Sequence, residues 1–274
     1  MDNIRIKDLE MNNLIDQISI CVPEKYLSDE AFRRGIEEKR KWLENMLKKY
    51  GSCSKIAYLN NKPVGMIQFC PEKAVPYKAG AREQVIEISC IFVGDRSLQG
   101  KGIGSKLLNS LIEDLSKPLP YFNNKPCKFI VTHAFETKSG TPQHIFYSRR
   151  GFKQIPGLSK IDLYYPITGE YEPPKTKIEK YKPLQEDFGS AIIFYSPNCP
   201  FSIKFAEQIK KLIKEVSKEI PAKTINIWEH PEEVTKRNTL KPIVNGKEIK
   251  TFFMNEEGFK KEVKNALENN IIFE

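Results

Sequence analysis

The sequence predicts a mixed α/β protein with two domains, and three observations support this. A run of β-branched and apolar residues at 85–93 precedes glycines at 100, 102 and 104 and then leucines at helical spacing, so a strand leads into a helix through a glycine-rich turn. Strand and helix patterns alternate along the rest of the chain. The length of 274 residues suits two domains of ordinary size.

The composition bears on the partners, the location and the metal content that we expect of this protein. The net charge of +9 comes from 44 basic and 35 acidic residues that are interspersed, so a nucleic-acid partner is permitted but not indicated. No window approaches 18 apolar residues and the first residues carry no signal-peptide core, so we expect a cytoplasmic protein without a membrane span. The six cysteines form no CxxC pair and the three histidines are dispersed, so no metal site is expected.

Several elements are expected before the glycine-rich turn. A helix begins at Ser28-Asp29-Glu30, where a capping side chain precedes an acid in the first turn, and it ends at Gly51. The remaining expected elements are a strand at 4–6, a helix at 9–21 and strands at 54–59 and 64–69.

Further elements follow the turn. We expect a helix at 105–115, a strand at 128–135, a helix around 145–147 that ends at Gly151-Phe152, and a strand at 161–165. A stretch rich in proline and lysine at 166–183 reads as a linker.

The glycine-rich turn predicts an anion site. The first N–H groups of the following helix have no partner within the helix, and such a helix start binds a phosphate or pyrophosphate. The spacing of a P-loop is absent, and so is the G-x-G-x-x-G of a dinucleotide-binding fold. Here the glycines alternate as G-x-G-x-G, and Gln99 precedes them.

The pattern Gln/Arg-x-x-Gly-x-Gly/Ala after an apolar strand, which Gln99, Gly102 and Gly104 match, resembles the coenzyme A loop of the GNAT acetyltransferases. The alternative is a glycine-rich turn that binds nothing. The resemblance covers residues 1–168 and implies the GNAT fold with a mixed central sheet, and acetyl-CoA as co-substrate. It also implies the residues that bind the coenzyme: Ile91, Phe92, Val93, Gln99, Gly100, Lys101, Gly102, Ile103, Gly104 and Ser105.

The resemblance also implies two catalytic residues. Glu87 is the only acid in an otherwise apolar strand, and a carboxylate there is costly unless it is used or paired. In the family, a glutamate on this strand is the general base, and a tyrosine matching Tyr147 protonates the departing thiolate. The alternative for Glu87 is a solvated acid at an edge of the sheet. The alternative for Tyr147 is an aromatic core residue. The family's asparagine before the closing helix is replaced here by the segment 137–142.

The last part of the chain predicts a smaller domain. A buried strand at 190–196 is followed by Pro197–Ser202 and a helix, and Leu240–Lys247 resembles the strand, cis-proline and hairpin of thioredoxin and glutaredoxin folds. The CxxC motif of those folds is reduced to Cys-Pro-Phe-Ser. With the first domain, this resembles GNAT proteins that carry a C-terminal YoaP-like domain. The expected domains are residues 1–168 and 188–274, with a linker at 169–187.

Cys199 is the third candidate for chemistry. It precedes a helix, whose dipole and N–H groups favour the thiolate. Ser202 cannot resolve a disulfide, so two-cysteine chemistry within this motif is excluded, while a mixed disulfide with a small thiol is allowed. The alternative is a module kept for packing or docking.

We therefore expect an acetyl-CoA-dependent N-acetyltransferase that modifies a primary amine of a small molecule or peptide. In this reading Glu87 is the base and Tyr147 the acid, and a homodimer is compatible with the family. One alternative is a thiol-binding or redox module that uses Cys199 beside a GNAT domain that senses coenzyme A. Another is an interaction protein whose C-terminal domain docks a macromolecule.

Overall fold

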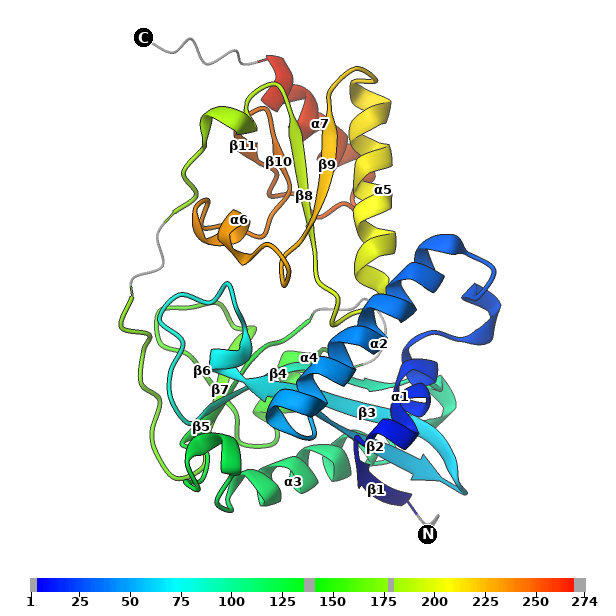
Figure 1. Ribbon diagram of the computed structural model, residues 1–274, viewed down its shortest axis with the longest axis vertical. Coiled ribbons are helices and arrows are strands. Elements are labelled where there is room, and N and C mark those ends of the chain that lie inside the picture. Colours follow the sequence, from blue (N-terminus) through cyan, green and yellow to red (C-terminus); the bar gives the residue numbers. More distant parts are fainter. Residues whose placement is uncertain (1–3, 136–140, 177–179, 269–274) are drawn as a thin grey trace. The chain divides into compact units, whose positions relative to one another are not determined.

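The computed structural model describes residues 4–135, 141–176 and 180–268, and these residues confirm the mixed α/β class (Figure 1). The chain divides into two compact units. Unit 1 comprises Met1–Lys25 and Arg40–Lys175, and unit 2 comprises Tyr26–Lys39 and Thr176–Glu274. The division falls inside helix α2 (Glu30–Tyr50). The domain limits expected at residues 168 and 188 stay a prediction.

Unit 1 is built on a seven-stranded sheet with the order β1-β2-β3-β4-β5-β7-β6. Only β4 and β5 run parallel, and the other neighbours are antiparallel, so the described sheet is mixed as expected. The strands are β1 (Ile4–Asp8), β2 (Ser54–Leu59), β3 (Lys62–Pro71), β4 (Val85–Val93), β5 (Phe129–His133), β6 (Lys153–Gln154) and β7 (Asp162–Pro166).

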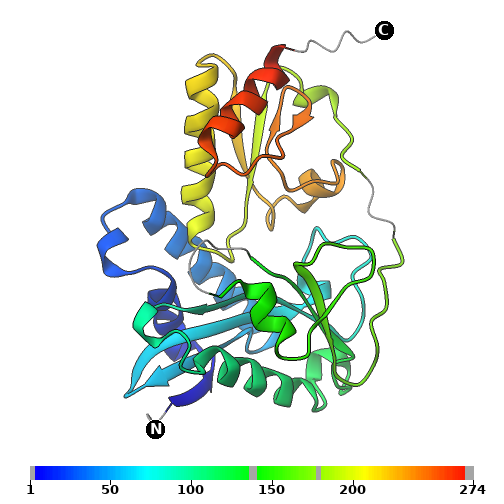
Figure 2. The same cartoon turned by 180° about the vertical axis from the view of Figure 1, so that it is seen from behind.

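Helices cover both faces of this sheet. Helix α1 (Leu14–Cys21) lies on one face, and helices α3 (Ile103–Leu115) and α4 (Gln143–Ser148) lie on the other (Figures 1 and 2). The leucine spacing that predicted α3 places Leu107, Leu108 and Leu111 entirely inside the core. The helix that carries the glycine-rich turn is therefore fixed to the sheet by apolar burial.

The expected ends of α2 are confirmed. Asp29 Oδ1 accepts a hydrogen bond from the backbone N–H of Ala31 at 2.9 Å, which caps the start of the helix. At the other end, Gly51 has φ of +78°, and its N–H donates to the carbonyl of Leu47 at 3.0 Å. Two local signals in the sequence thus set the length of this helix.

The sheet opens between β4 and β5. Their parallel pairing ends at Ile88 and Thr132, although β4 continues to Val93. On the other side of β4, the register with β3 shifts by one residue, so Ser89 is the extra residue of a β-bulge. A bulge of this kind bends its strand, and among the described residues no strand pairs with the end of β4 on the β5 side.

Unit 2 holds a four-stranded sheet with the order β11-β10-β8-β9, in which β8 and β9 run parallel. Helices α5 and α7 pack together on this sheet and share a core with β8. The elements are β8 (Ala191–Tyr195), α5 (Phe201–Val216), β9 (Ala222–Asn226), α6 (Pro231–Thr235), β10 (Ile243–Val244), β11 (Lys247–Glu248) and α7 (Glu256–Glu268).

The hairpin of unit 2 matches the sequence in one respect and departs from it in another. Asn245 and Gly246 have φ of 47° and 73°, which is the left-handed turn that joins β10 to β11. The expected cis-proline at Pro242 is wrong, because the described residues contain no cis peptide bond. Proline permits the cis form without requiring it, since the preference for trans is only about 0.5–1 kcal/mol.

Among the residues that the structure describes, none of the helices combines the length and hydropathy that a membrane crossing requires. The same residues contain no group of three or more histidine, cysteine, aspartate or glutamate side chains placed to hold a metal ion.

Candidate functional site

The glycine-rich turn has a backbone that requires glycine. Gly100 and Gly102 have φ of +79° and +83°, a region that residues with a side chain rarely adopt. Gly104 is needed for another reason, because a Cβ there would lie 3.2 Å from the ring of Phe146 on α4. The three glycines shape the turn and let α4 approach the start of α3.

The start of α3 offers unpaired donors. The N–H of Lys106 donates to the carbonyl of Gly102 at 3.0 Å, and this is the bond that opens the helix. The N–H groups of residues 103–105 therefore have no partner within the helix, as at any helix start. A phosphate group is the ligand that such donors and the helix dipole favour.

A guanidinium group that the sequence analysis missed stands beside these donors. The Nε and Nη2 atoms of Arg150 donate to Ser105 Oγ at 3.0 and 2.6 Å, and its guanidinium lies 3.9 Å from the ring centre of Phe146. Burial and the neighbouring Arg149 lower the pKa of Arg150, so an anion here would relieve an unfavourable positive charge. The available signal was a basic residue directly before the Gly151 turn.

The end of β4 turns polar backbone atoms toward the opening. The carbonyl of Ile91 accepts from Gln143 Nε2 at 3.3 Å, and that of Val93 accepts from Gln99 Nε2 at 3.2 Å. Gln143 Oε1 also accepts from the N–H of Phe135 at 2.9 Å, so this side chain bridges the two sides of the opening. The ring of Phe92 is 40% exposed. The backbone groups of 91 and 93 can therefore bind an extended ligand.

Gln143 was also missed by the sequence analysis. It stands one residue after the segment 137–142, where the family's asparagine was expected, and residues 136–140 of that region lie outside the described part. Its side-chain amide, of the same kind as that of the expected asparagine, was the signal that could have identified it.

Glu87 is a paired carboxylate. Its Oε2 atom lies 2.5 Å from the Nζ of Lys78, and the two side chains are 27% and 29% exposed. From the sequence we expected an acid in this apolar strand to have either a functional role or a charged partner. The partner is a lysine nine residues earlier. Glu87 is thus neither at an edge of the sheet nor simply solvated.

Two further residues hold Lys78 in place. Its Nζ lies 2.9 Å from Oε1 of Glu72, a side chain that is fully buried. Arg82 donates to both oxygens of Glu72 through its guanidinium and to Oε2 through its backbone N–H. The guanidinium of Arg82 also lies 5.1 Å from the ring centre of Phe129. The four charged residues therefore form one alternating network with little freedom to move.

The network makes stability depend on pH. Burial raises the pKa of Glu72, but Arg82 and Lys78 outweigh it and lower the pKa from 4.5 to about 2. Because the folded-state pKa is below the unfolded one, Glu72 stabilises the protein above about pH 4.5 and loses this effect as the pH falls toward 2.

We therefore expect Glu72→Gln to be less stable than the parent at pH 7, with a difference that shrinks steadily below pH 4.5. Urea unfolding at a series of pH values measures this. Glu83→Gln is the matched control, because Glu83 is 68% exposed and pairs with the exposed Lys73. A difference that stays constant down to pH 2 would contradict the assigned charge on Glu72.

Tyr147 is fully enclosed, with 1% of its surface exposed. Its ring packs against Phe146 and Phe152, with centroids at 5.3 and 4.8 Å. Burial raises the pKa of its hydroxyl, with a smaller contribution from Cys90, while a hydrogen bond with Thr132 opposes it. The hydroxyl thus stays protonated beside Thr132, where the pairing of β4 with β5 ends.

Residues 17–152 match the model of the acetyltransferase (GNAT) family. The matched stretch contains β4, the glycine-rich turn and both helices that pack beside it. The chain contains a GNAT acetyltransferase domain. This confirms the expectation of a GNAT-type N-acyltransferase enzyme, and the match does not reach residues 153–274.

Three solved structures illustrate the likeness of this domain. PH1933 from Pyrococcus horikoshii OT3 is 25% identical, with 59% of this chain and 96% of that chain covered and a TM-score of 0.41. The PaiA N-acetyltransferase from Thermoplasma acidophilum is 16% identical, with coverages of 60% and 99% and a TM-score of 0.42. A GNAT family acetyltransferase from Brucella melitensis is 17% identical, with coverages of 63% and 93% and a TM-score of 0.39.

These TM-scores are below 0.5, so the assignment of the GNAT domain rests on the sequence match. No curated protein matches the chain at a significant level.

Cys199 belongs to unit 2, whereas the other candidate residues belong to unit 1. It is exposed, and its carbonyl accepts from the N–H of Ser202 at 3.0 Å. Ser202 Oγ in turn accepts from the N–H of Ser196 at 2.9 Å, so this hydroxyl shapes the turn. Within the same unit, Gly35 approaches so closely that a Cβ there would clash with the carbonyl oxygen of Pro200. The turn that carries Cys199 therefore tolerates only glycine at 35.

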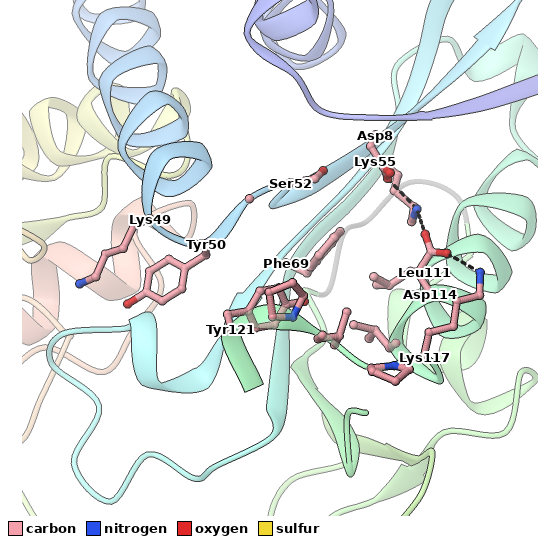
Figure 3. A pocket seen from close by; sticks show the side chains of 15 residues that line it. Asp8, Lys49, Tyr50, Ser52, Lys55, Phe69, Leu111, Asp114, Lys117 and Tyr121 are labelled. Atoms are coloured by element: carbon pink, nitrogen blue, oxygen red, sulfur yellow. Dashed lines mark hydrogen bonds and ion pairs between the residues drawn. The ribbon is translucent and has the colours of Figure 1, made fainter. Parts of the chain in front are cut away.

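A hollow of about 740 Å³ lies at the end of α3 remote from the glycine-rich turn (Figure 3). Lys55 Nζ lies 2.7 Å from Asp8 and also binds Asp114, whose other oxygen lies 3.0 Å from Lys117. Tyr121, Phe69 and Leu111 lie on the apolar side of the hollow. Because both aspartates of its wall are paired with lysines of the same wall, we assign no ligand to this hollow.

Proposed function

We propose that the protein is an acetyl-CoA-dependent N-acetyltransferase that transfers the acetyl group to a primary amine within a ternary complex. The observation that carries this proposal is the position of the glycine-rich turn at the start of α3, in the same unit as the open edge of β4. Membership of the domain in the GNAT family supports acetyl-CoA as the donor.

The described groups fit coenzyme A at both ends. The pyrophosphate would bind the N–H groups of residues 103–105, with the guanidinium of Arg150 beside them and Gln99 at the turn. The pantetheine arm would lie along residues 91–93 in place of the hydrogen bond from Gln143. Lys101 and the glycines would then surround the phosphates without blocking them, since a Cβ at Gly100 or Gly102 meets no atom within 4 Å.

The transfer makes a bond between nitrogen and the acetyl carbon and breaks the bond between that carbon and sulfur. Glu87 would accept the proton of the amine, directly or through a water. A backbone N–H at 91–93 would stabilise the oxyanion that forms on the acetyl group. Tyr147, which stays protonated because it is buried, would supply a proton to the departing thiolate and recover one from solvent. Glu87 then passes its proton to solvent, which balances the proton that Tyr147 recovers, so a neutral amine and acetyl-CoA give the amide and coenzyme A.

Unit 2 would be a thioredoxin-like domain of the YoaP-like kind. Its strand order, with one parallel pair and a hairpin, supports this assignment. Cys199 would act through a mixed disulfide with a small thiol, because its motif offers Ser202 in place of a second cysteine. The linker would be residues 169–187.

Calorimetric titration with acetyl-CoA tests the coenzyme site. We expect the full-length protein to bind and Gly102→Glu to lose at least about tenfold in affinity, because the new side chain strains the turn and repels the phosphates. Gly157→Glu is the control, since Gly157 also has a positive φ, of 78°, and open space around it. Equal binding by Gly102→Glu and the parent would overturn the assigned site.

A further inference from the structure

In the ion pair between Glu87 and Lys78, each side chain can still form a further hydrogen bond. Among the described residues, Lys78 Nζ contacts only Glu72 and Glu87, at 2.9 and 2.5 Å, so one of its three N–H groups is left. Glu87 contacts Lys78 through Oε2, and no described residue donates to its Oε1. A donor from a fixed cation and an acceptor from a carboxylate thus lie side by side.

Both groups are accessible and pre-organised. The side chains of Lys78 and Glu87 are 29% and 27% exposed, whereas Glu72 behind them is fully buried. Glu72 is in turn held by Arg82, whose guanidinium lies 5.1 and 5.2 Å from the ring centres of Phe129 and Tyr171. A ligand that binds Lys78 would therefore not have to immobilise a flexible lysine, which is the main entropic cost of such a contact.

The complement of this pair is a zwitterion. An ammonium or amine group fits the free oxygen of Glu87, and a carboxylate one carbon away fits the remaining N–H of Lys78. A polyamine, or an amine without a carboxylate, would make the contact with Glu87 but not the contact with Lys78. A ligand with two amino groups would place a like charge against Lys78, which is unfavourable at such a distance.

We propose that the acceptor is a free α-amino acid, whose carboxylate is recognised by Lys78 while its amine faces Glu87. This inference rests on the proposed acetyltransferase function and names its class of acceptor. It makes Lys78 a specificity-determining residue, which also keeps Glu87 in position.

The test is a panel of amino acids, the matching amino acid amides, polyamines and peptides, assayed by release of coenzyme A from acetyl-CoA. The amide keeps the amine and the side chain but removes the negative charge. We expect each reactive amino acid to exceed its amide in kcat/KM by roughly 10–100-fold, mainly through KM, as for a hydrogen bond between charged groups. In Lys78→Gln this preference should vanish, while Lys78→Arg should retain much of it.

Lys73→Gln is the matched control, because Lys73 is 51% exposed, lies nearby in the chain and pairs with the exposed Glu83. It should keep the preference of the parent. Amides that react as well as the acids, or a preference that survives Lys78→Gln, would overturn the inference while leaving an active acetyltransferase. No release of coenzyme A with any amine would instead overturn the proposed function, since polyamines, amides and peptides belong to the same panel. Circular dichroism of each variant confirms that it is folded.

Discussion

Replacing Glu87 by glutamine should lower turnover by roughly 10²–10⁴-fold, the usual contribution of one acid–base group. Glutamine has the size of glutamate and still accepts a hydrogen bond from Lys78, so the network with Glu72 and Arg82 should persist. It cannot accept the proton of the amine. The affinity for coenzyme A should be nearly unchanged, because the groups proposed to bind it are residues 91–93 and the start of α3. Steady-state kinetics and calorimetry on the same preparation measure both quantities.

Two outcomes would identify another role for this residue. Full turnover in Glu87→Gln would mean that a water or another group takes the proton and that Glu87 is structural. Loss of acetyl-CoA binding together with turnover would mean that the variant disturbs the sheet. Glu83→Gln serves as the control for removing a negative charge in the same region, since Glu83 is 68% exposed, and it should keep both activity and affinity.

The sequence predicted the glycine-rich turn and the helix that follows it because their determinants are local. A left-handed backbone at residues 100 and 102 depends on glycine alone, and the leucine spacing of α3 fixes which face is buried. The same holds for the cap at Asp29 and the turn at Gly51. Such signals need no knowledge of the rest of the fold, so they could be interpreted from sequence alone.

The partners of the site residues could not be predicted, because they come from loops whose path depends on tertiary packing. Lys78 reaches Glu87 only because the loop before β4 is fixed by Glu72 and Arg82. Arg150 reaches Ser105 across a sequence separation of 45 residues. The assignment of Tyr26–Lys39 to unit 2 has the same cause, since it depends on contacts with distant parts of the chain.

Unit 2 contains a buried ion pair that joins the segment just after α6 to the segment before β8. Arg237 and Asp187 are both fully buried, and their charged atoms lie 2.8 Å apart. The guanidinium also contacts Glu186 and Glu233, at 2.5 and 2.7 Å, and Asp187 accepts at its other oxygen from the hydroxyl of Tyr181 at 3.0 Å. Every strong donor of the arginine thus has a carboxylate or carbonyl partner.

Arg237→Met should destabilise unit 2 by about 3–5 kcal/mol, because it leaves the carboxylate of Asp187 buried without a counter-charge. Asp187→Leu should cost less, since Glu186 and Glu233 still neutralise the guanidinium. A chain with two compact units need not unfold in one step, so amide hydrogen exchange of β8 under native conditions is the appropriate measurement.

The double variant Arg237→Met with Asp187→Leu decides what the pair contributes. It leaves no unpaired buried charge, so it should recover much of the stability that Arg237→Met loses, as happens when apolar residues replace a buried ion pair. Lys236→Met is the control, because Lys236 contacts the same Glu186 and Glu233 but is 37% exposed, and it should cost less than about 1 kcal/mol. If the double variant is as unstable as the sum of both single ones, the loss comes from the shape of the two side chains and not from the unpaired charge.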